Sequence, residues 1–355
     1  MHPNMTILDN LVAINLSVTI WSARKKLTAE DFSGGVSSDN LPPEELASLG
    51  SKRICNPADL RVFGALKSRA TTLLDRNGVR FLGGWALPES CITSIQAELE
   101  TIAVEFVREK EAFLNRYDDA VRDWIQNNPG WESIISNSVV SADYVRSRFG
   151  FGWQMFKVQP AAVRDASPES VVNAGLDDAV TSLGETLFGE VAKAATDAWQ
   201  KSFVGKQEVT RKALSPLKTI HNKLAGLSFV EPRVAPVADL LATAFSAVGK
   251  RGHILGPTLV MLQGVVSLLR DPEALLAHAQ SMLQGSSAHD VLSILGGVSM
   301  SYESGAFPAM EGEEDETADV PNDAGIADDA DIADGEELPQ ALLPVGAHLD
   351  SLGLW

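Results

Sequence analysis

Two long stretches of the chain carry apolar side chains at the spacing of an α-helix, and they constrain the fold more than any other feature of the sequence. Because the apolar positions recur at intervals of three, four or seven, one face of each helix can be buried. At 1.5 Å per residue each helix is roughly 50 Å long, and we expect the two to pack as an antiparallel hairpin with a coiled-coil surface. The apolar positions of the first stretch, residues 92–128, are Ile95, Leu99, Ile102, Phe106, Phe113, Tyr117, Val121 and Trp124. Those of the second, residues 170–203, are Leu176, Val180, Leu183, Leu187, Val191, Ala194 and Ala198.

Three shorter stretches predict a small sheet. Residues 12–20 alternate apolar side chains with small or polar ones, which indicates a strand with one buried face. A second strand is expected near residues 79–85, with Gly83 and Gly84 ending it as a turn or bulge. A third is expected at residues 150–158, where Phe151, Trp153 and Met155, with Phe149 just before, lie on one face. We expect the three strands to form one antiparallel sheet.

The rest of the chain continues as helices that are separated by Pro or Gly. The short connections between these helices are typical of a helical bundle. The predicted fold class is therefore α+β and α-dominant: a small sheet, a long helical hairpin, a C-terminal helical bundle and a disordered acidic tail. The expected helices of the bundle are 208–224, 235–248, 257–269, 272–284 and 288–295. The expected domain boundaries are 1–204 for sheet and hairpin, 205–307 for the bundle, 308–337 for an acidic linker and 338–355 for an apolar terminal peptide.

The acidic charge of the chain is concentrated at its C-terminal end. The sequence has 47 Asp and Glu against 29 Lys and Arg, a formal charge of -18, but residues 311–355 hold 14 acidic residues and no basic ones. Residues 308–337 are too polar to bury a core, so we expect them to be disordered. Residues 338–355 are apolar again, which is typical of a docking peptide or of an end that folds back on its own body. The candidate docking residues are Leu349, Leu352, Leu354 and Trp355.

Several common catalytic motifs are missing from the sequence. A GxxxxGK[ST] phosphate loop, a GxGxxG turn after a strand, HExxH, GxSxG and paired CxxC are all missing. The six histidines show no spacing that places two imidazoles on one helical face. We therefore expect no catalytic residue, no cofactor and no metal site, with an unrecognised activity as the alternative. Cys55 and Cys91 are expected to be buried free thiols.

Nothing in the sequence indicates secretion or membrane insertion. The N-terminus has no basic segment followed by an apolar one. The most apolar stretch, residues 254–269, is shorter than the roughly 20 residues that a membrane span requires. We expect this stretch to be a core helix and the protein to be cytoplasmic.

Two groups of basic residues are the candidate contact for an anion or a partner. Arg146 and Arg148 stand two positions apart near the start of the third strand, where they can share a face and hold a carboxylate or a phosphate. Arg24, Lys25 and Lys26 follow the first strand, and the two groups form one patch if these strand ends are neighbours. The alternative is that the arginines pair with acidic residues of the long helices.

Five segments of the sequence carry a family resemblance. They are VAINLSVTIWSARKKL (12–27), LPPEELASLGSKRIC (41–55), GVRFLGGW (78–85), ADYVRSRF (142–149) and LAGLSFVEPRVAP (224–236). They resemble an uncharacterised bacterial family of unknown function that is found on conjugative islands, plasmids and phages, over about residues 7–300. The resemblance implies a genomic neighbourhood: a MoxR-type AAA+ ATPase and a cobalt-chelatase-like protein with a von Willebrand A domain. It implies no catalytic residues.

These observations favour a non-enzymatic adaptor or regulatory partner of a AAA+ ATPase complex of a bacterial mobile element. A von Willebrand A domain protein is a further expected partner. One alternative is a nucleic-acid-associated factor of a conjugative element or phage, in which the basic groups contact phosphates. Another is a self-assembling structural protein, a homo-oligomer whose helices pack between copies.

Overall fold

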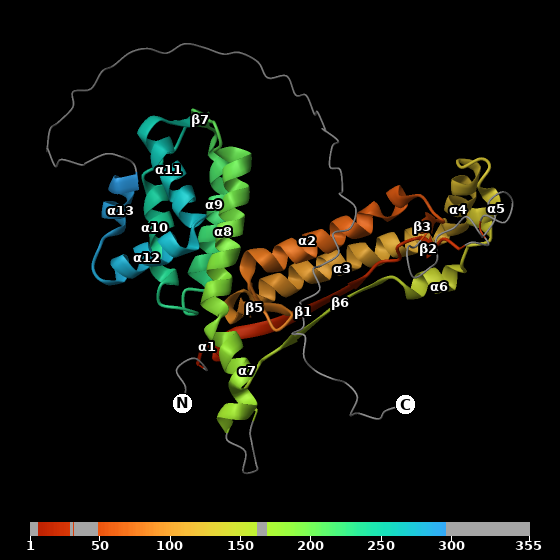
Figure 1. Cartoon of the computed structure of the whole chain (residues 1–355), viewed down its shortest axis with the longest axis horizontal. Helices are drawn as coiled ribbons and strands as arrows, with labels where there is room; N and C mark the ends of the chain where they lie inside the picture. The colour runs from red at the N-terminus through yellow and green to blue at the C-terminus, as the bar shows by residue number, and fades with distance from the viewer. Residues whose placement is uncertain (1–5, 29–30, 32–48, 162–168, 296–355) are drawn as a thin grey trace. The chain divides into compact units, whose positions relative to one another are not determined.

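The computed structural model describes residues 6–28, 31, 49–161 and 169–295. The expected disordered linker (308–337) and docking peptide (338–355) lie outside these residues. Within them, a small antiparallel sheet is combined with many helices, so the fold is α+β and α-dominant, as predicted (Figure 1).

The strands are β1 (Leu11–Thr19), β2 (Arg24–Lys26), β3 (Ser51–Arg53), β4 (Val79–Phe81), β5 (Gly84–Pro88), β6 (Gly150–Phe156), β7 (Glu208–Val209) and β8 (Ile254–Leu255). The α-helices are α1 (Thr6–Asp9), α2 (Arg61–Asn77), α3 (Ile92–Asn115), α4 (Tyr117–Gln126), α5 (Glu132–Ser136), α6 (Ala142–Ser147), α7 (Glu169–Thr181), α8 (Leu183–Ser202), α9 (Leu214–Gly226), α10 (Val234–Ser246), α11 (Gly256–Leu269), α12 (Pro272–Leu283) and α13 (Ala288–Leu295), with short 3-10 turns at Pro57–Leu60, Glu89–Cys91 and Arg211–Ala213.

The predicted sheet is present and has the strand order β4-β5-β1-β6, with every pair antiparallel. The stretch expected as one strand at 79–85 is instead a hairpin. Leu82 and Gly83 form its two-residue turn, and both have positive φ values, 47° and 76°, as a type I′ turn requires. Gly84 already belongs to β5, where a Cβ atom would collide with the carbonyl oxygen of Ile14 in β1.

The two faces of the sheet are buried in two different hydrophobic clusters. Side chains alternate across a strand, so consecutive residues of β5 lie on opposite faces of the sheet. Trp85 and Leu87 pack with the α2–α3 side, and Ala86 packs with α8 and the bundle. Phe151, Trp153 and Met155 of β6 lie on the α2–α3 side, as the alternation predicts, whereas Phe156 is exposed. There Phe63 of α2 contacts the rings of Phe106 and Phe149 at centroid distances of 5.1 and 4.4 Å.

The two long helical stripes are helical, but each is interrupted and they do not pair with each other. The first is divided at Arg116 into α3 and α4, and the second at Ser182 into α7 and α8. The expected hairpin partner is wrong: α3 lies antiparallel beside α2 (Figure 1). The buried residues of α3 and of α8 belong to separate clusters, because α8 packs on α9, α11 and β4.

The C-terminal helices follow the predicted pattern closely, from α9 to α13. The one difference is at residues 208–213, where the expected helix begins late because Val209 of β7 pairs with Ile254 of β8. Residues on both sides of position 204, the expected domain boundary, share one hydrophobic cluster, and contacts group Met1–Ser301 into one unit. Within the described ranges, no helix has the length and apolar character needed to cross a membrane.

Candidate functional site: a basic cavity at the end of β1

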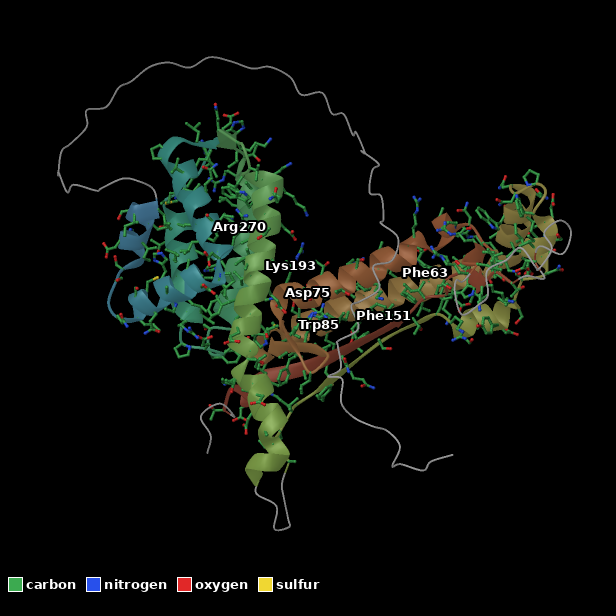
Figure 2. All side chains as sticks on the ribbon, viewed as in Figure 1. Phe63, Asp75, Trp85, Phe151, Lys193 and Arg270 are labelled. Carbon is green, nitrogen blue, oxygen red and sulfur yellow. The ribbon has the colours of Figure 1, made fainter. Side chains whose placement is uncertain are left out.

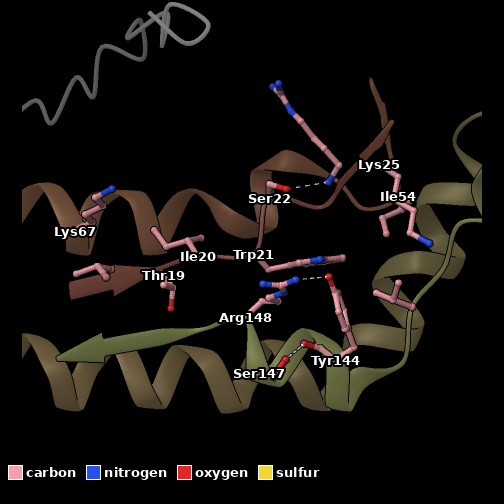
Figure 3. Close-up of a pocket in the computed structure, with 13 residues that line it drawn as sticks. Thr19, Ile20, Trp21, Ser22, Lys25, Ile54, Lys67, Tyr144, Ser147 and Arg148 are labelled. Atoms are coloured by element: carbon pink, nitrogen blue, oxygen red, sulfur yellow. Dashed lines mark hydrogen bonds between the residues drawn. The ribbon is translucent and has the colours of Figure 1, made fainter. Parts of the chain in front are cut away.

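A cavity of about 590 Å³ lies where the chain leaves β1 (Figure 3). The end of β1 and the residues after it form one wall, and β2, α2 and α6 contribute the others. Small-molecule sites in proteins have volumes in this range. Two aromatic residues, Trp21 and Tyr144, lie in its lining. Its charged lining residues are Arg24, Lys25, Lys67 and Arg148.

Trp21 fixes the path of the chain beside the cavity. Its side chain is buried, and its ring lies 6.2 Å from that of Phe113 and 5.6 Å from that of Tyr117. Two residues later, Ala23 has a positive φ of 53°, and its carbonyl oxygen accepts a hydrogen bond from the amide of Ile54 at 2.9 Å. The burial of this indole against Phe113 of α3 and Tyr117 of α4 fixes the chain just before β2.

The ribbon of β2 and β3 brings two basic segments together. Lys25 stands opposite Lys52 in the antiparallel register. Lys52 forms an ion pair with Asp31, and this hydrogen bond holds the pKa of the Asp31 carboxyl below its usual value. Lys52 is therefore neutralised locally, whereas Lys25 lines the cavity.

The structure separates the two arginines that the sequence placed on one strand face. Arg146 and Arg148 belong to helix α6 and its C-terminal cap, so the expectation that they share a strand face is wrong, whereas the strand expected from residue 150 is present as β6. Residues two apart point to different sides of a helix. Arg146 forms an ion pair with Glu111 of α3 at 2.6 Å, which is the alternative that the sequence left open. Arg148 donates to the hydroxyl of Tyr144 at 2.9 Å, with its guanidinium carbon 5.0 Å from the ring centroid.

Three of the five predicted basic residues thus meet at one cavity: Arg24, Lys25 and Arg148. Arg146 and Lys26 are not among its lining residues. The sequence reasoning missed Lys67, which comes from α2. Lys67 stands one helical turn after the buried Phe63, and only the packing of α2 beside the sheet places its side chain at the cavity.

The expected docking residues Leu349, Leu352, Leu354 and Trp355 lie outside the described residues.

The cysteines do not form a reactive site. Burial raises the pKa of the Cys55 thiol to about 12, and the nearby Asp59 carboxylate adds to the effect. Burial also raises the pKa of Cys91, whose side chain is half-buried rather than fully buried as expected. Because the thiolate is the nucleophile, neither thiol is activated. In the part of the chain that the structure describes, no three His, Cys, Asp or Glu side chains gather as metal ligands.

A second polar cluster links the sheet side of the unit to the bundle. The Nζ atom of Lys223, whose side chain is 9% exposed, lies 2.6 Å from the Glu190 carboxylate and 2.6 Å from the backbone oxygen of Asp75. The Asp75 carboxylate accepts from the Trp85 indole at 2.7 Å and pairs with Arg80 at 3.0 Å (Figure 2). The amide of Arg80 also donates to Glu190 at 3.0 Å. Since its members bind one another and the backbone, this cluster is structural.

Comparison with known proteins places the chain in a family. Residues 8–271 match the family described as "Protein of unknown function (DUF3150)". The chain belongs to the DUF3150 family. The matched range includes the sheet, the α2–α3 pair and every lining residue of the cavity. No curated protein and no solved structure matches the sequence.

Proposed function

We propose that this DUF3150 protein is a non-enzymatic adaptor or regulatory partner of a AAA+ ATPase complex of a bacterial mobile element. The class of partner comes from the resemblance described above, and a von Willebrand A domain protein is the second expected partner. The observation that carries the binding role is an exposed apolar surface on α3. We call Val104 and Val107, with the charged residues around them, the valine face.

Val104 and Val107 of the valine face belong to neither hydrophobic cluster. Val104 and Val107 are 71% and 56% exposed, and residues three apart lie on the same side of a helix. They point away from the buried stripe of α3, which includes Ile102 and Phe106. Valine is a poorer helix former than alanine or glutamate, since its branched side chain loses rotamer freedom. Burial against another molecule would offset that cost.

The surroundings of the two valines fit a protein interface. Glu100, Arg108 and Glu111 occupy neighbouring positions on the same side of α3. An apolar centre with a charged rim is the usual arrangement of a protein–protein contact. The valine face therefore favours a protein partner, with the terminal peptide at 338–355 as a second, tethered contact.

Affinity capture from the native host tests the proposal. Tagged full-length protein is compared with Val104→Glu/Val107→Glu and with Val260→Glu, and co-purifying proteins are identified by mass spectrometry. Val260 on α11 is also exposed, at 48%, so it controls for the introduced charge. We expect the AAA+ ATPase with the wild type and with Val260→Glu, and its loss with the double variant. Absence of the ATPase from the wild-type capture would overturn the adaptor proposal.

A version that ends at Met310 tests the terminal peptide in the same experiment. Loss of the ATPase with this version assigns the docking contact to the peptide that holds Leu349, Leu352, Leu354 and Trp355. Full recovery removes the peptide from the proposal and leaves the valine face as the contact. Equal recovery with wild type and Val104→Glu/Val107→Glu removes the valine face instead.

A further inference from the structure

We propose that the cavity at the end of β1 binds a nucleotide, either free or as a unit of a single-stranded nucleic acid. Its phosphate would lie against Lys25, Lys67 and Arg148, and its base against Tyr144. This site lies outside the valine face, and the proposal does not depend on the adaptor role.

The charge of the cavity favours a phosphate. Four of its described lining residues are positively charged and none is acidic. Lys25, Lys67 and Arg148 form no ion pair with any described carboxylate. A phosphate monoester carries about -1.5 to -2 charges at neutral pH and has three acceptor oxygens. A carboxylate carries one charge and two acceptor oxygens, so it would leave more of the positive charge uncompensated.

The aromatic part of the cavity favours a flat ring next to that phosphate. Tyr144 is 44% exposed, and its hydroxyl accepts a hydrogen bond from Arg148 at 2.9 Å. Figure 3 shows Tyr144, Arg148 and Trp21 side by side at the cavity. Bases unstacked from a duplex are commonly bound by stacking on tyrosine rings and on guanidinium planes. Val18, Ile20 and Ile54 add apolar surface to the same lining.

Fluorescence anisotropy of the full-length protein at low salt tests this site. One probe is a fluorescent AMP and the other a fluorescein-labelled dT12, so the two arms separate a free nucleotide from a single strand. Unlabelled AMP, inorganic phosphate and a hexaglutamate peptide serve as competitors. The variants are Lys67→Gln and Arg148→Gln. The matched control is Lys218→Gln on α9, an exposed lysine outside the cavity lining.

We expect saturable binding of at least one probe and a Kd that rises about fivefold in each cavity variant, as the loss of one exposed ion pair implies. For dT12, each variant should also reduce the slope of log K against log salt by about one. Lys218→Gln should bind as the wild type does. Circular dichroism confirms that each variant is folded.

Three results would overturn the proposal. The first is no binding of either probe at low salt. The second is binding that Lys67→Gln and Arg148→Gln leave unchanged, because the ligand would then sit elsewhere. The third is displacement of the probes by hexaglutamate at lower concentration than by unlabelled AMP, which would make the cavity a carboxylate site. None of these results bears on ATPase capture through the valine face.

Discussion

Removing the amino group of Lys223 should destabilise the protein more than the loss of any surface lysine. In Lys223→Met the side chain keeps an unbranched apolar stem but loses the amino group and with it both 2.6 Å contacts, to Glu190 and to the oxygen of Asp75. The Glu190 carboxylate, 24% exposed, then retains only its bond from the Arg80 amide. The substitution therefore leaves a partly buried charge without its counter-ion.

The burial of this ion pair sets the expected loss in the free energy of unfolding. Each hydrogen bond to a charged group contributes about 1.5–3 kcal/mol, and breaking a fully buried pair costs about 3–5 kcal/mol. Water can reach Glu190 and replace part of the loss, so we expect a decrease of about 2–3 kcal/mol in the free energy of unfolding. With an m-value of about 3 kcal/mol/M, the urea midpoint should fall by about 0.7–1 M.

Urea unfolding followed by circular dichroism measures this shift. The control is Lys193→Met, an exposed lysine on α8 (Figure 2), which should change the stability by less than about 0.5 kcal/mol. Adding Glu190→Leu to Lys223→Met should recover part of the loss, because the unpaired charge is removed. Equal midpoints for Lys223→Met and Lys193→Met would refute the inferred role of the cluster.

Three further predictions concern single sites. Cys55 should not react with Ellman's reagent in the folded protein between pH 7 and pH 9, because its pKa of about 12 keeps the thiol protonated; rapid labelling of Cys55 at pH 8, located by mass spectrometry, would contradict this. Gly84→Ala should strongly lower the urea midpoint of unfolding, since the new Cβ atom collides with the Ile14 carbonyl oxygen. Its control is Gly64→Ala on α2, where a Cβ atom has open space, and this variant should raise the free energy of unfolding by about 0.5–1 kcal/mol. Leu82→Asn should raise the melting temperature, because Leu82 is 54% exposed and adopts a φ of 47° that asparagine tolerates better; a lower melting temperature would count against a strained turn.

Periodicity predicted the elements of this fold better than their partners. The alternation in β1 and β6 and the spacing in α9–α13 each follow from which side of an element is buried. The spacing of apolar residues does not say which element covers the buried side. The prediction therefore paired α3 with α8, whereas α3 packs beside α2. The sequence near Arg116 has no Pro or Gly, so the break between α3 and α4 left no signal.

The basic residues that line the cavity were predicted only in part, for a related reason. Arg24, Lys25 and Arg148 were found because they are basic residues next to predicted strands. The strand β3 was missed since three polar residues carry no alternation, and the short helix α6 was taken for a strand start because it is under two turns long. Lys67 is far from the others in sequence, and only the packing of α2 places it at the cavity.

Site-specific crosslinking tests the adaptor proposal most directly. A photoreactive benzoylphenylalanine at position 107, on the valine face, is compared in the native host with the same group at position 260 on α11. We expect a covalent adduct with the AAA+ ATPase from position 107 and none from position 260. An adduct between two copies of this chain from position 107, or an ATPase adduct of equal yield from both positions, would contradict it.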